Sequence, residues 1–581
     1  MSKSPQYLEL AERMQAIKRY FIFAGVFSAA INCLMLVPII YMLQVYDRVI
    51  TSGSMSTLGS LTLIMVCLLS AAGAFEWVRS MILIRASNRM DLDLRERVFD
   101  ATFKNSLLGG SQDSGGQFIQ DLSSLRQFLT GNGLYAFFDA PWFPIYVGVM
   151  FLFHPWFGIA AIFAGIVMII LAAINERATS KRLQDANSKA NWVANQTIGN
   201  LRNAEVIAAM GMTENLRTQQ EQFSNEVLVL QTNASQAASV LSSLSKSFRM
   251  IMQSSLLGIG ALLALQQEIT PGMMIAGSLL LGRALAPIDL LVGNWKGFSV
   301  ARAQYGRLGE LLAKVPEDLE TMDLPAPSGS VNVQKITVVP PGAKTPAIKN
   351  VSLDLKAGEA LAIIGPSASG KSTLARALLG IWPAAGGHVR LDNANIASWD
   401  RKKLGPHIGY LPQDIELFDG TISQNICRFG EIDSEKIVEA ATLAGVHEMI
   451  LHLPQGYDTV IGGVGGVLSG GQRQRIGLAR AIYGNPCFIV LDEPNSNLDE
   501  NGERELVVSL QRIKEQGCTI VIITHRTSVL NIADKMLMLL AGTTNLYGPK
   551  DQVLAKLLEA QQAAQSKDAT PISNSNAAQS N

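Results

Sequence analysis

One short stretch decides the fold of this chain: Gly365-Pro366-Ser367-Ala368-Ser369-Gly370-Lys371-Ser372-Thr373. It follows the apolar run 360–364 and precedes a helical pattern over 374–379. A strand, a glycine-rich turn and a helix in this order predict a loop whose backbone N–H groups point at a polyphosphate. We expect Lys371 to lie near the β- and γ-phosphates and the Ser372 hydroxyl to bind Mg²⁺. The stretch therefore predicts binding of a nucleoside triphosphate.

Two acidic residues and a glutamine extend this prediction. The apolar run 487–491 ends in Asp492 and Glu493, and Gln413 ends another short apolar run. We expect Asp492 to hold the Mg²⁺ shell and Glu493 to polarise water as the general base. The Gln413 amide has the chemistry to reach both Mg²⁺ and the attacking water. An acidic pair alone is often only a solvated strand end, so the prediction depends on the other motifs.

Two more motifs complete the order. Ser469-Gly470-Gly471-Gln472 precedes the predicted helix 473–483, which indicates a second anion site at a helix N-terminus. The buried strand pattern 520–524 ends in His525, which is suited to contact a γ-phosphate. A lone histidine is usually structural. The order of all five motifs along the chain is far more specific than any one of them.

Composition places part of the chain in lipid. Of its 581 residues 48% are hydrophobic and only 17% are charged, which is unusual for a soluble ATPase. The formal net charge is zero, so nothing global indicates a nucleic-acid partner. Because a bilayer takes about 20 apolar helical residues, six spans are predicted: 21–43, 58–84, 134–153, 156–174, 249–267 and 273–293. The third is interrupted by Asp139, Pro141 and Pro144, but neighbouring helices can satisfy the freed backbone.

Basic residues predict the orientation of these spans. The connectors after the second and fourth spans carry six and seven Lys and Arg residues, whereas Arg48 is the only basic residue in the other three connectors. The positive-inside rule then makes the two long connectors and both termini cytoplasmic. Within these connectors, 85–103 and 176–209 have helical patterns and predict stalks that extend the membrane helices.

Glycines mark candidate bends in the stalks, and these bends are candidate contacts with the ATP-binding half. They are Gly109-Gly110 with Gly115-Gly116, Gly199 and Gly211. Solvated loops without a partner are the alternative.

Ionisable residues within predicted spans are functional candidates by default. They are Glu76, Arg79, Arg283, Asp289 and, at the interrupted span, Asp139. We expect Arg79, Arg283 and Asp289 to lie towards the cytoplasmic ends and to snorkel into the interface. A polar lining for a substrate path between helices is the other interpretation.

The order of the five nucleotide motifs resembles the ATP-binding cassette family. In that family two cassettes pair head to tail, so the Ser-Gly-Gly-Gln motif of one covers the ATP on the phosphate loop of the other. The resemblance implies a homodimer with ATP and Mg²⁺ at two hydrolytic sites, each completed in trans by Ser469, Gly470, Gly471 and Gln472. The implied fold is an α-helical six-span transmembrane domain followed by an α/β P-loop ATP-binding cassette.

This plan predicts five segments along the chain. They are a cytoplasmic N-terminal segment 1–20, the transmembrane domain with stalks 21–313, a linker 314–330, the cassette 331–560 and a disordered tail 561–581.

The membrane half is similar to the type I secretion exporters of Gram-negative bacteria, in the branch that exports proteases, lipases or haem-acquisition proteins. The similarity covers roughly residues 15 to 555 and is carried by the runs 36–48, 137–144, 202–212 and 492–499. It implies export of an unfolded protein with a C-terminal signal across the bacterial inner membrane. It also implies two partners, a periplasmic adaptor (membrane fusion) protein and an outer-membrane channel protein.

The sequence departs from the pattern of this family in two runs. The run 336–341 has no aromatic residue to stack on adenine, and 461–467 lacks a glutamate common in exporters.

Three other functions are alternatives to protein export. An ABC exporter of lipid or small molecules shares the same domain plan. A processing exporter needs a protease domain ahead of the first span, where only about 20 residues stand. A cassette acting in DNA repair or translation is opposed by the six spans.

Overall fold

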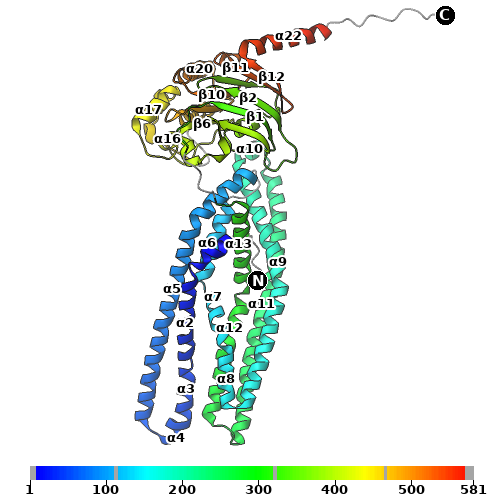
Figure 1. Ribbon diagram of the computed structural model, residues 1–581. Coiled ribbons are helices and arrows are strands. Elements are labelled where there is room, and N and C mark those ends of the chain that lie inside the picture. The colour runs from blue at the N-terminus through cyan, green and yellow to red at the C-terminus, as the bar shows by residue number, and fades with distance from the viewer. Residues whose placement is uncertain (1–7, 110–115, 318–323, 463–467, 569–581) are drawn as a thin grey trace, which may run out of the picture. The chain divides into compact units, whose positions relative to one another are not determined.

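The computed structural model describes residues 8–109, 116–317, 324–462 and 468–568 (Figure 1). The chain divides into two compact units, one of residues 1–106 and 111–317 and the other of residues 318–581 with 107–110. The described part of the first unit is helical, and the second is built on β-sheets with flanking helices. This is the predicted fold class of six helical spans followed by an α/β nucleotide-binding unit.

Each of the six predicted spans falls on a helical stretch that is long and apolar enough to cross a membrane, and only the fifth, 249–267, extends beyond its stretch, by two residues past Leu265. These stretches are Lys18–Ser52, Met55–Gly109, Gly133–Phe153, Pro155–Arg202, Thr213–Leu265 and Pro271–Gly293. The elements of the unit are α1 (Leu8–Gln15), α2 (Lys18–Leu34), α3 (Val37–Gln44), the π-helix η2 (Val45–Val49), α4 (Ile50–Ser52), α5 (Met55–Gly109), α6 (Gly116–Thr130), α7 (Asn132–Asp139), the 3₁₀ turn η3 (Ala140–Trp142), α8 (Phe143–Phe153), α9 (Pro155–Arg202), α10 (Ala204–Ala209), α11 (Thr213–Leu265), α12 (Pro271–Gly293) and α13 (Trp295–Lys314).

The third span is broken where its sequence predicts. Pro141 lies in η3, which separates α7 from α8, because proline cannot donate the backbone hydrogen bond of a continuous helix. Close packing compensates for the break. A Cβ atom at Gly165 of α9 would lie 2.3 Å from the ring of Phe143, at the start of α8. Glycine at this position lets the ring approach the neighbouring helix, as small residues do in membrane interfaces.

Three helices continue well beyond the membrane-spanning length. Helices α5, α9 and α11 contain 55, 48 and 53 residues, so each is roughly 70–80 Å long against a hydrocarbon core of about 30 Å. The predicted stalk helix 85–103 is confirmed within α5. The predicted stalk 176–209 is interrupted at Asn203, not at Gly199, which lies inside α9. No helix range was predicted within 213–248, yet α11 begins at Thr213 and packs along α9.

The second unit contains a four-stranded sheet in the order β2-β1-β4-β5 and a six-stranded sheet in the order β12-β11-β3-β10-β9-β6. Strands β11, β3, β10, β9 and β6 are parallel, and β12 is antiparallel. The strands are β1 (Val331–Val338), β2 (Ile348–Leu355), β3 (Ala360–Ile364), β4 (Gly386–Leu391), β5 (Ala394–Asn395), β6 (Ile408–Leu411), β7 (Gly420–Thr421), β8 (Val460–Ile461), β9 (Phe488–Asp492), β10 (Thr519–Ile523), β11 (Lys535–Leu540) and β12 (Thr543–Pro549).

Two hydrophobic clusters cover the two faces of the larger sheet. Ile520 and Ile522 of β10 pack in one cluster with helices α16, α17, α19 and α20, and Val521 and Ile523 pack in the other with α14 and the smaller sheet. The helical elements are α14 (Lys371–Leu378), η4 (Ile396–Ser398), α15 (Arg401–Leu404), η5 (Gly405–His407), α16 (Ile422–Ile426), α17 (Ser434–Leu443), α18 (His447–Leu451), η6 (Gly456–Asp458), α19 (Gly470–Ile482), α20 (Glu500–Glu515), α21 (Thr527–Leu530) and α22 (Lys550–Asp568).

Two sequence predictions on helix boundaries were wrong. Helix α19 begins at Gly470 and not at residue 473, so Gly470 and Gly471 both belong to its first turn. Helix α22 continues to Asp568, so the predicted tail 561–581 is helical at its start. The rest of that tail lies outside the described residues.

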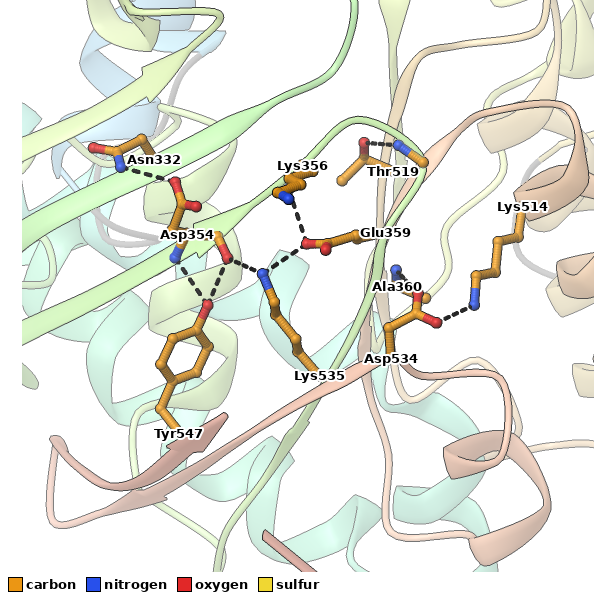
Figure 2. Close-up of polar contacts among 11 residues, drawn as sticks. Asn332, Asp354, Lys356, Glu359, Ala360, Lys514, Thr519, Asp534, Lys535 and Tyr547 are labelled. Carbon is orange, nitrogen blue, oxygen red and sulfur yellow. Dashed lines mark hydrogen bonds and ion pairs between the residues drawn. The ribbon is translucent and has the colours of Figure 1, made fainter. Parts of the chain in front are cut away.

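A polar network joins the two sheets at the amino ends of the parallel strands (Figure 2). The Lys535 ammonium on β11 donates to Glu359 Oε2 at 2.7 Å and to the Asp354 carbonyl of β2 at 3.0 Å. The neighbouring Asp534 accepts from Lys514 Nζ at 2.7 Å and from the Ala360 N–H at 2.9 Å. The starts of β3 and β11 are therefore fixed by charge-assisted hydrogen bonds. The opposite edge, where the strands end, carries the predicted site.

Arg79 does not snorkel, contrary to the prediction. Its side chain is only 3% exposed, and it donates to Asp139 Oδ1 at 3.2 Å and to the Ser28 hydroxyl at 2.9 Å. The ring of Tyr135 lies 4.4 Å from the guanidinium carbon. Asp139 also accepts from Asn32 Nδ2 at 2.9 Å. Since charge in lipid needs partners within the protein, this cluster ties α2, α5 and the broken third span together.

Asp289 is also paired within the unit, while Arg283 is exposed. The Asp289 carboxylate of α12 lies 3.3 Å from Arg249 Nε of α11, and its side chain is only 10% exposed. Arg283 lies 3.0 Å from the Met35 sulfur. Snorkelling therefore stays a prediction for Arg283 alone.

Replacing Arg79 with alanine is expected to destabilise the protein by about 3 kcal/mol, because Asp139 loses its guanidinium partner. The thermal unfolding midpoint of the detergent-solubilised chain measures this loss. Adding Asp139→Asn should recover part of it, since the unpaired charge is then gone. Arg85→Ala, an exposed arginine six residues further along α5, is the matched control. Equal midpoints for the Arg79 and Arg85 variants would contradict a stabilising ion pair.

Candidate functional site

Parallel pairing gathers four predicted motifs at one edge of the sheet. Strand β10 lies between β3 and β9, and β6 pairs with the other side of β9. In register, Ile363 pairs with Ile523, Ile523 with Asp492, and Leu491 with Leu411. The four strands therefore end side by side, and each runs directly into its motif. Ligands of open parallel sheets bind at this carboxyl edge.

The phosphate loop follows β3 and depends on two glycines. Gly365 has φ +152°, and a Cβ atom there would lie 2.3 Å from the Leu539 carbonyl oxygen of β11. Gly370 has φ +96° and precedes α14 as its N-cap. These backbone conformations are disfavoured for residues with a side chain. The loop Gly365 to Thr373 therefore wraps towards the start of α14, which begins at Lys371, as an anion-binding loop requires.

Lys371 lies inside this loop. Its side chain is 8% exposed, and its ammonium donates to the carbonyl oxygens of Gly365 at 2.8 Å and Pro366 at 3.0 Å. A cation is thus held against two backbone carbonyl groups of the loop. Ser369 is 2% exposed, and its hydroxyl has no hydrogen-bond partner among the residues that the structure describes. An ammonium and a hydroxyl are the types of group that bind phosphate oxygens.

Asp492 ends β9 in a buried position with spare acceptor capacity. Its side chain is 2% exposed, and within the described part of the chain Oδ2 has no hydrogen-bond partner. Burial raises the pKa of this carboxyl, with Glu493 adding to the rise, while a hydrogen bond from Ser372 and the charges of Arg376 and Lys371 lower it. A buried carboxylate with an unsatisfied oxygen beside a serine hydroxyl is the donor set that Mg²⁺ takes next to phosphates.

Glu493 and Gln413 face each other across the strand ends. Gln413 Nε2 donates to Glu493 Oε2 at 3.1 Å. Glu493 has φ +52°, a left-handed conformation that is uncommon without glycine, and its N–H donates to the Ile523 carbonyl at 2.9 Å. The turn therefore directs the carboxylate away from β9 and towards the glutamine.

His525 follows β10 and is exposed. The residue before it is fixed, because the Thr524 hydroxyl is buried and donates to Asn495 Oδ1 at 3.0 Å. The Arg526 N–H donates to the same hydroxyl at 3.1 Å. The backbone around His525 is thus tied to the turn that follows Glu493.

The predicted second anion site lies elsewhere on the same unit. Ser469 is the N-cap of α19, and it forms a capping box with Gln472, whose Oε1 accepts from the Ser469 N–H at 2.8 Å. The atoms nearest to a Cβ built on Gly470 or Gly471 belong to Asn497. The structure thus brings together the loop 365–373 with residues 413, 492, 493 and 525, and it places residues 469–472 beside the turn after Glu493.

Sequence reasoning missed two residues of this region, Gln474 and Asn495. Gln474 is 2% exposed and bonds to the turn 493–497 from α19. The available signal was a glutamine at helical spacing from the apolar residues Leu478 and Ala481. Of the run 461–467, which lacks the expected glutamate, residues 463–467 lie outside the described residues.

Comparisons with known proteins identify both units. Residues 21–286 match the family of ABC transporter transmembrane regions, and residues 348–496 match the ABC transporter family. The chain is 44% identical over 556 residues to the type I secretion system ATP-binding protein PrsD of Rhizobium meliloti, with 95% of each chain covered. It is 28% identical to the leukotoxin translocation ATP-binding protein LktB of Bibersteinia trehalosi, covering 92% of this chain and 76% of the relative.

A solved structure agrees with this placement at the level of the fold. The structure of a bacterial Atm1-family ABC exporter with ATP bound is similar with a TM-score of 0.77 and 22% identity, covering 96% of this chain and 99% of that one. With both units matched and a relative aligned over nearly its whole length, the chain belongs to the ABC transporter family, as a multi-pass ATPase of the type I secretion group.

Proposed function

We propose that this chain is the ATPase and permease that exports an unfolded protein with a C-terminal secretion signal across the bacterial inner membrane. The observation that carries this proposal is the 44% identity with a type I secretion ATP-binding protein, which extends over 95% of both chains and so includes the membrane half. ATP drives the export. The functional domains are the six-span region with its stalks, 21–313, and the cassette, 331–560, joined by the linker 314–330.

ATP binds at the carboxyl edge of the six-stranded sheet. The loop from Gly365 to Thr373 supplies backbone donors, and Lys371 exchanges its carbonyl partners for phosphate oxygens. Glu493 accepts the proton of the attacking water, while Gln413, at 3.1 Å from that carboxylate, orients the water. His525 contacts the γ-phosphate from the end of β10.

Mg²⁺ fits the residues present. Ser372 and Asp492 lie together, and Asp492 has a free carboxylate oxygen. Among the described residues no group of three or more His, Cys, Asp and Glu side chains could hold a metal ion. The ion therefore needs phosphate oxygens as further ligands, as in other P-loop enzymes. When bound, it neutralises charge that develops between the phosphates.

The working unit is a homodimer. Ser469, Gly470, Gly471 and Gln472 cap a helix N-terminus beside Asn497, and this arrangement leaves the motif available to a nucleotide on a second copy. Two such contacts make two composite ATP sites, which close on binding and separate after hydrolysis. The stalks predicted at 85–103 and 176–209 convert this movement into opening of a path between the spans.

The orientation and partners follow from the same proposal. Basic residues concentrate in the extensions of the long helices beyond the spans, which supports a cytoplasmic position for these extensions and for both termini. A periplasmic adaptor protein and an outer-membrane channel protein continue the path outward. Nucleic acid has no part in it.

Glu493→Gln is expected to leave ATP binding intact and to lower steady-state ATP hydrolysis by about 10²-fold, because the general base is lost. The release of phosphate by the purified protein in lipid nanodiscs measures the rate, and a fluorescent ATP analogue measures binding. Glu439→Gln changes an exposed glutamate of α17 and serves as the control. Hydrolysis near the normal rate would remove Glu493 from its proposed role.

Lys371→Ala should abolish secretion of a protein that carries the C-terminal signal, when the chain is expressed with its adaptor and channel partners. The readout is the tagged protein in the culture medium, with the exposed Lys344→Ala as the matched control. Unchanged secretion, together with ATP hydrolysis that rises on addition of lipid or a small molecule, would favour the rival exporter of lipid or small molecules.

Two inactive variants should restore each other if the ATP sites are composite. In a mixed dimer of Lys371→Ala and Ser469→Arg chains, one site carries both defects and the other carries neither. We therefore expect the mixed dimer to recover up to about half of the normal hydrolysis rate. Differently tagged chains, purified by both tags in sequence, provide this dimer. No recovery in a verified mixed dimer would contradict the head-to-tail arrangement.

A further inference from the structure

The side chain of Gln474 connects helix α19, whose N-cap is Ser469, to the turn 493–497 of the same chain. It lies five residues after Ser469 on α19 and is 2% exposed. Its Nε2 donates to the Glu493 carbonyl oxygen at 3.2 Å and to the Ser496 hydroxyl at 3.4 Å. Its Oε1 accepts from the Asn497 N–H at 2.9 Å. These three hydrogen bonds of one buried amide all end in the turn 493–497.

The Glu493 backbone needs such support. Its left-handed conformation costs roughly 1–2 kcal/mol in a residue with a side chain, so surrounding contacts must hold it. The Glu493 N–H is fixed by the Ile523 carbonyl of β10 at 2.9 Å. Its carbonyl accepts from the Ser496 N–H at 3.2 Å, within the turn, and from Gln474. Gln474 is therefore the link from this peptide to α19.

The helix and the turn also approach closely through their backbones. A Cβ atom on Gly471 would lie 2.8 Å from the Asn497 carbonyl oxygen, which is closer than side chains tolerate. The first turn of α19 thus lies directly against the turn 493–497. A shift of the N-terminal end of α19 must therefore displace the turn 493–497 or break the hydrogen bonds of Gln474.

We propose that Gln474 is a positioning residue that holds Glu493 in place from the helix that carries Ser469. The inference rests on the proposed function, in which Ser469 contacts the partner's nucleotide and Glu493 acts on the chain's own. Gln474 then relays engagement of the partner's ATP to the catalytic glutamate of the same chain. It touches no substrate, and it acts through the orientation of Glu493.

The first test is a steady-state comparison of Gln474→Leu with the normal full-length protein in nanodiscs. Leucine keeps the volume and loses the hydrogen bonds, so kcat should fall about 10-fold, while KM for ATP changes less than about 2-fold. Gln511→Leu, an exposed glutamine of α20, should leave both constants unchanged. An unchanged kcat, or a loss confined to KM, would overturn the proposal.

The second test separates an action on the chain's own Glu493 from an action on the partner. One mixed dimer combines Gln474→Leu and Glu493→Gln in one chain with an unmodified partner, and we expect about half of the normal rate. The other dimer places the two substitutions on different chains, and we expect about a tenth of the first dimer's rate. The reverse result, or equal rates in the two dimers, would overturn the proposal.

Two further measurements keep the outcome interpretable. Gln474→Glu retains an acceptor for the Asn497 N–H and loses the donor to Glu493, so it replaces the leucine variant in both dimers if that variant does not fold. The mixed dimer of Lys371→Ala and Ser469→Arg chains is measured in parallel. If this dimer recovers hydrolysis while the two Gln474 dimers have equal rates, only the role of Gln474 is rejected. If this dimer does not recover hydrolysis, the composite ATP sites themselves are rejected.

Discussion

Parallel pairing of β3, β10, β9 and β6 is the constraint on which the nucleotide site depends. The candidate site residues come from positions 365 to 525, and no local contact could bring them together. The register places four strand ends at one edge, so each motif needs only to follow its strand directly. Charged side chains fix the strand starts at the other edge, where Lys535, Glu359 and Asp534 bond across neighbouring elements (Figure 2). The chemistry at one edge therefore relies on structural contacts at the other.

The helical unit follows a different rule, because lipid offers no partners to polar groups. Arg79 is buried against Asp139, Ser28 and Tyr135, and Pro141 breaks the third span beside them. The break and the charge cluster belong together, since the cluster fixes the span where its helix is weakest. Gly165 on α9 then lets the ring of Phe143 pack closely beside the break.

The sequence was sufficient for features that depend on local pattern. Six apolar runs, the phosphate loop and the strand-end motifs were all found where they lie, because hydropathy and glycine spacing are local signals. Three features depend on tertiary contacts and were not predicted correctly. Arg79 was expected to snorkel because its partner is 60 residues away in the chain. Gln474 was missed because its role depends on a turn about 20 residues further on. Helix α11 begins at Thr213 because it packs along α9, in a stretch with no distinct apolar pattern.

The strand order has a consequence for biosynthesis. Strand β3, which carries the phosphate loop, pairs with β10 and β11, and both leave the ribosome more than 150 residues later. Such long-range pairing forms late. The membrane helices, which precede β3, are synthesised and available for insertion before this sheet can close. A truncated chain that lacks β10 and β11 would therefore insert into the bilayer without hydrolysing ATP.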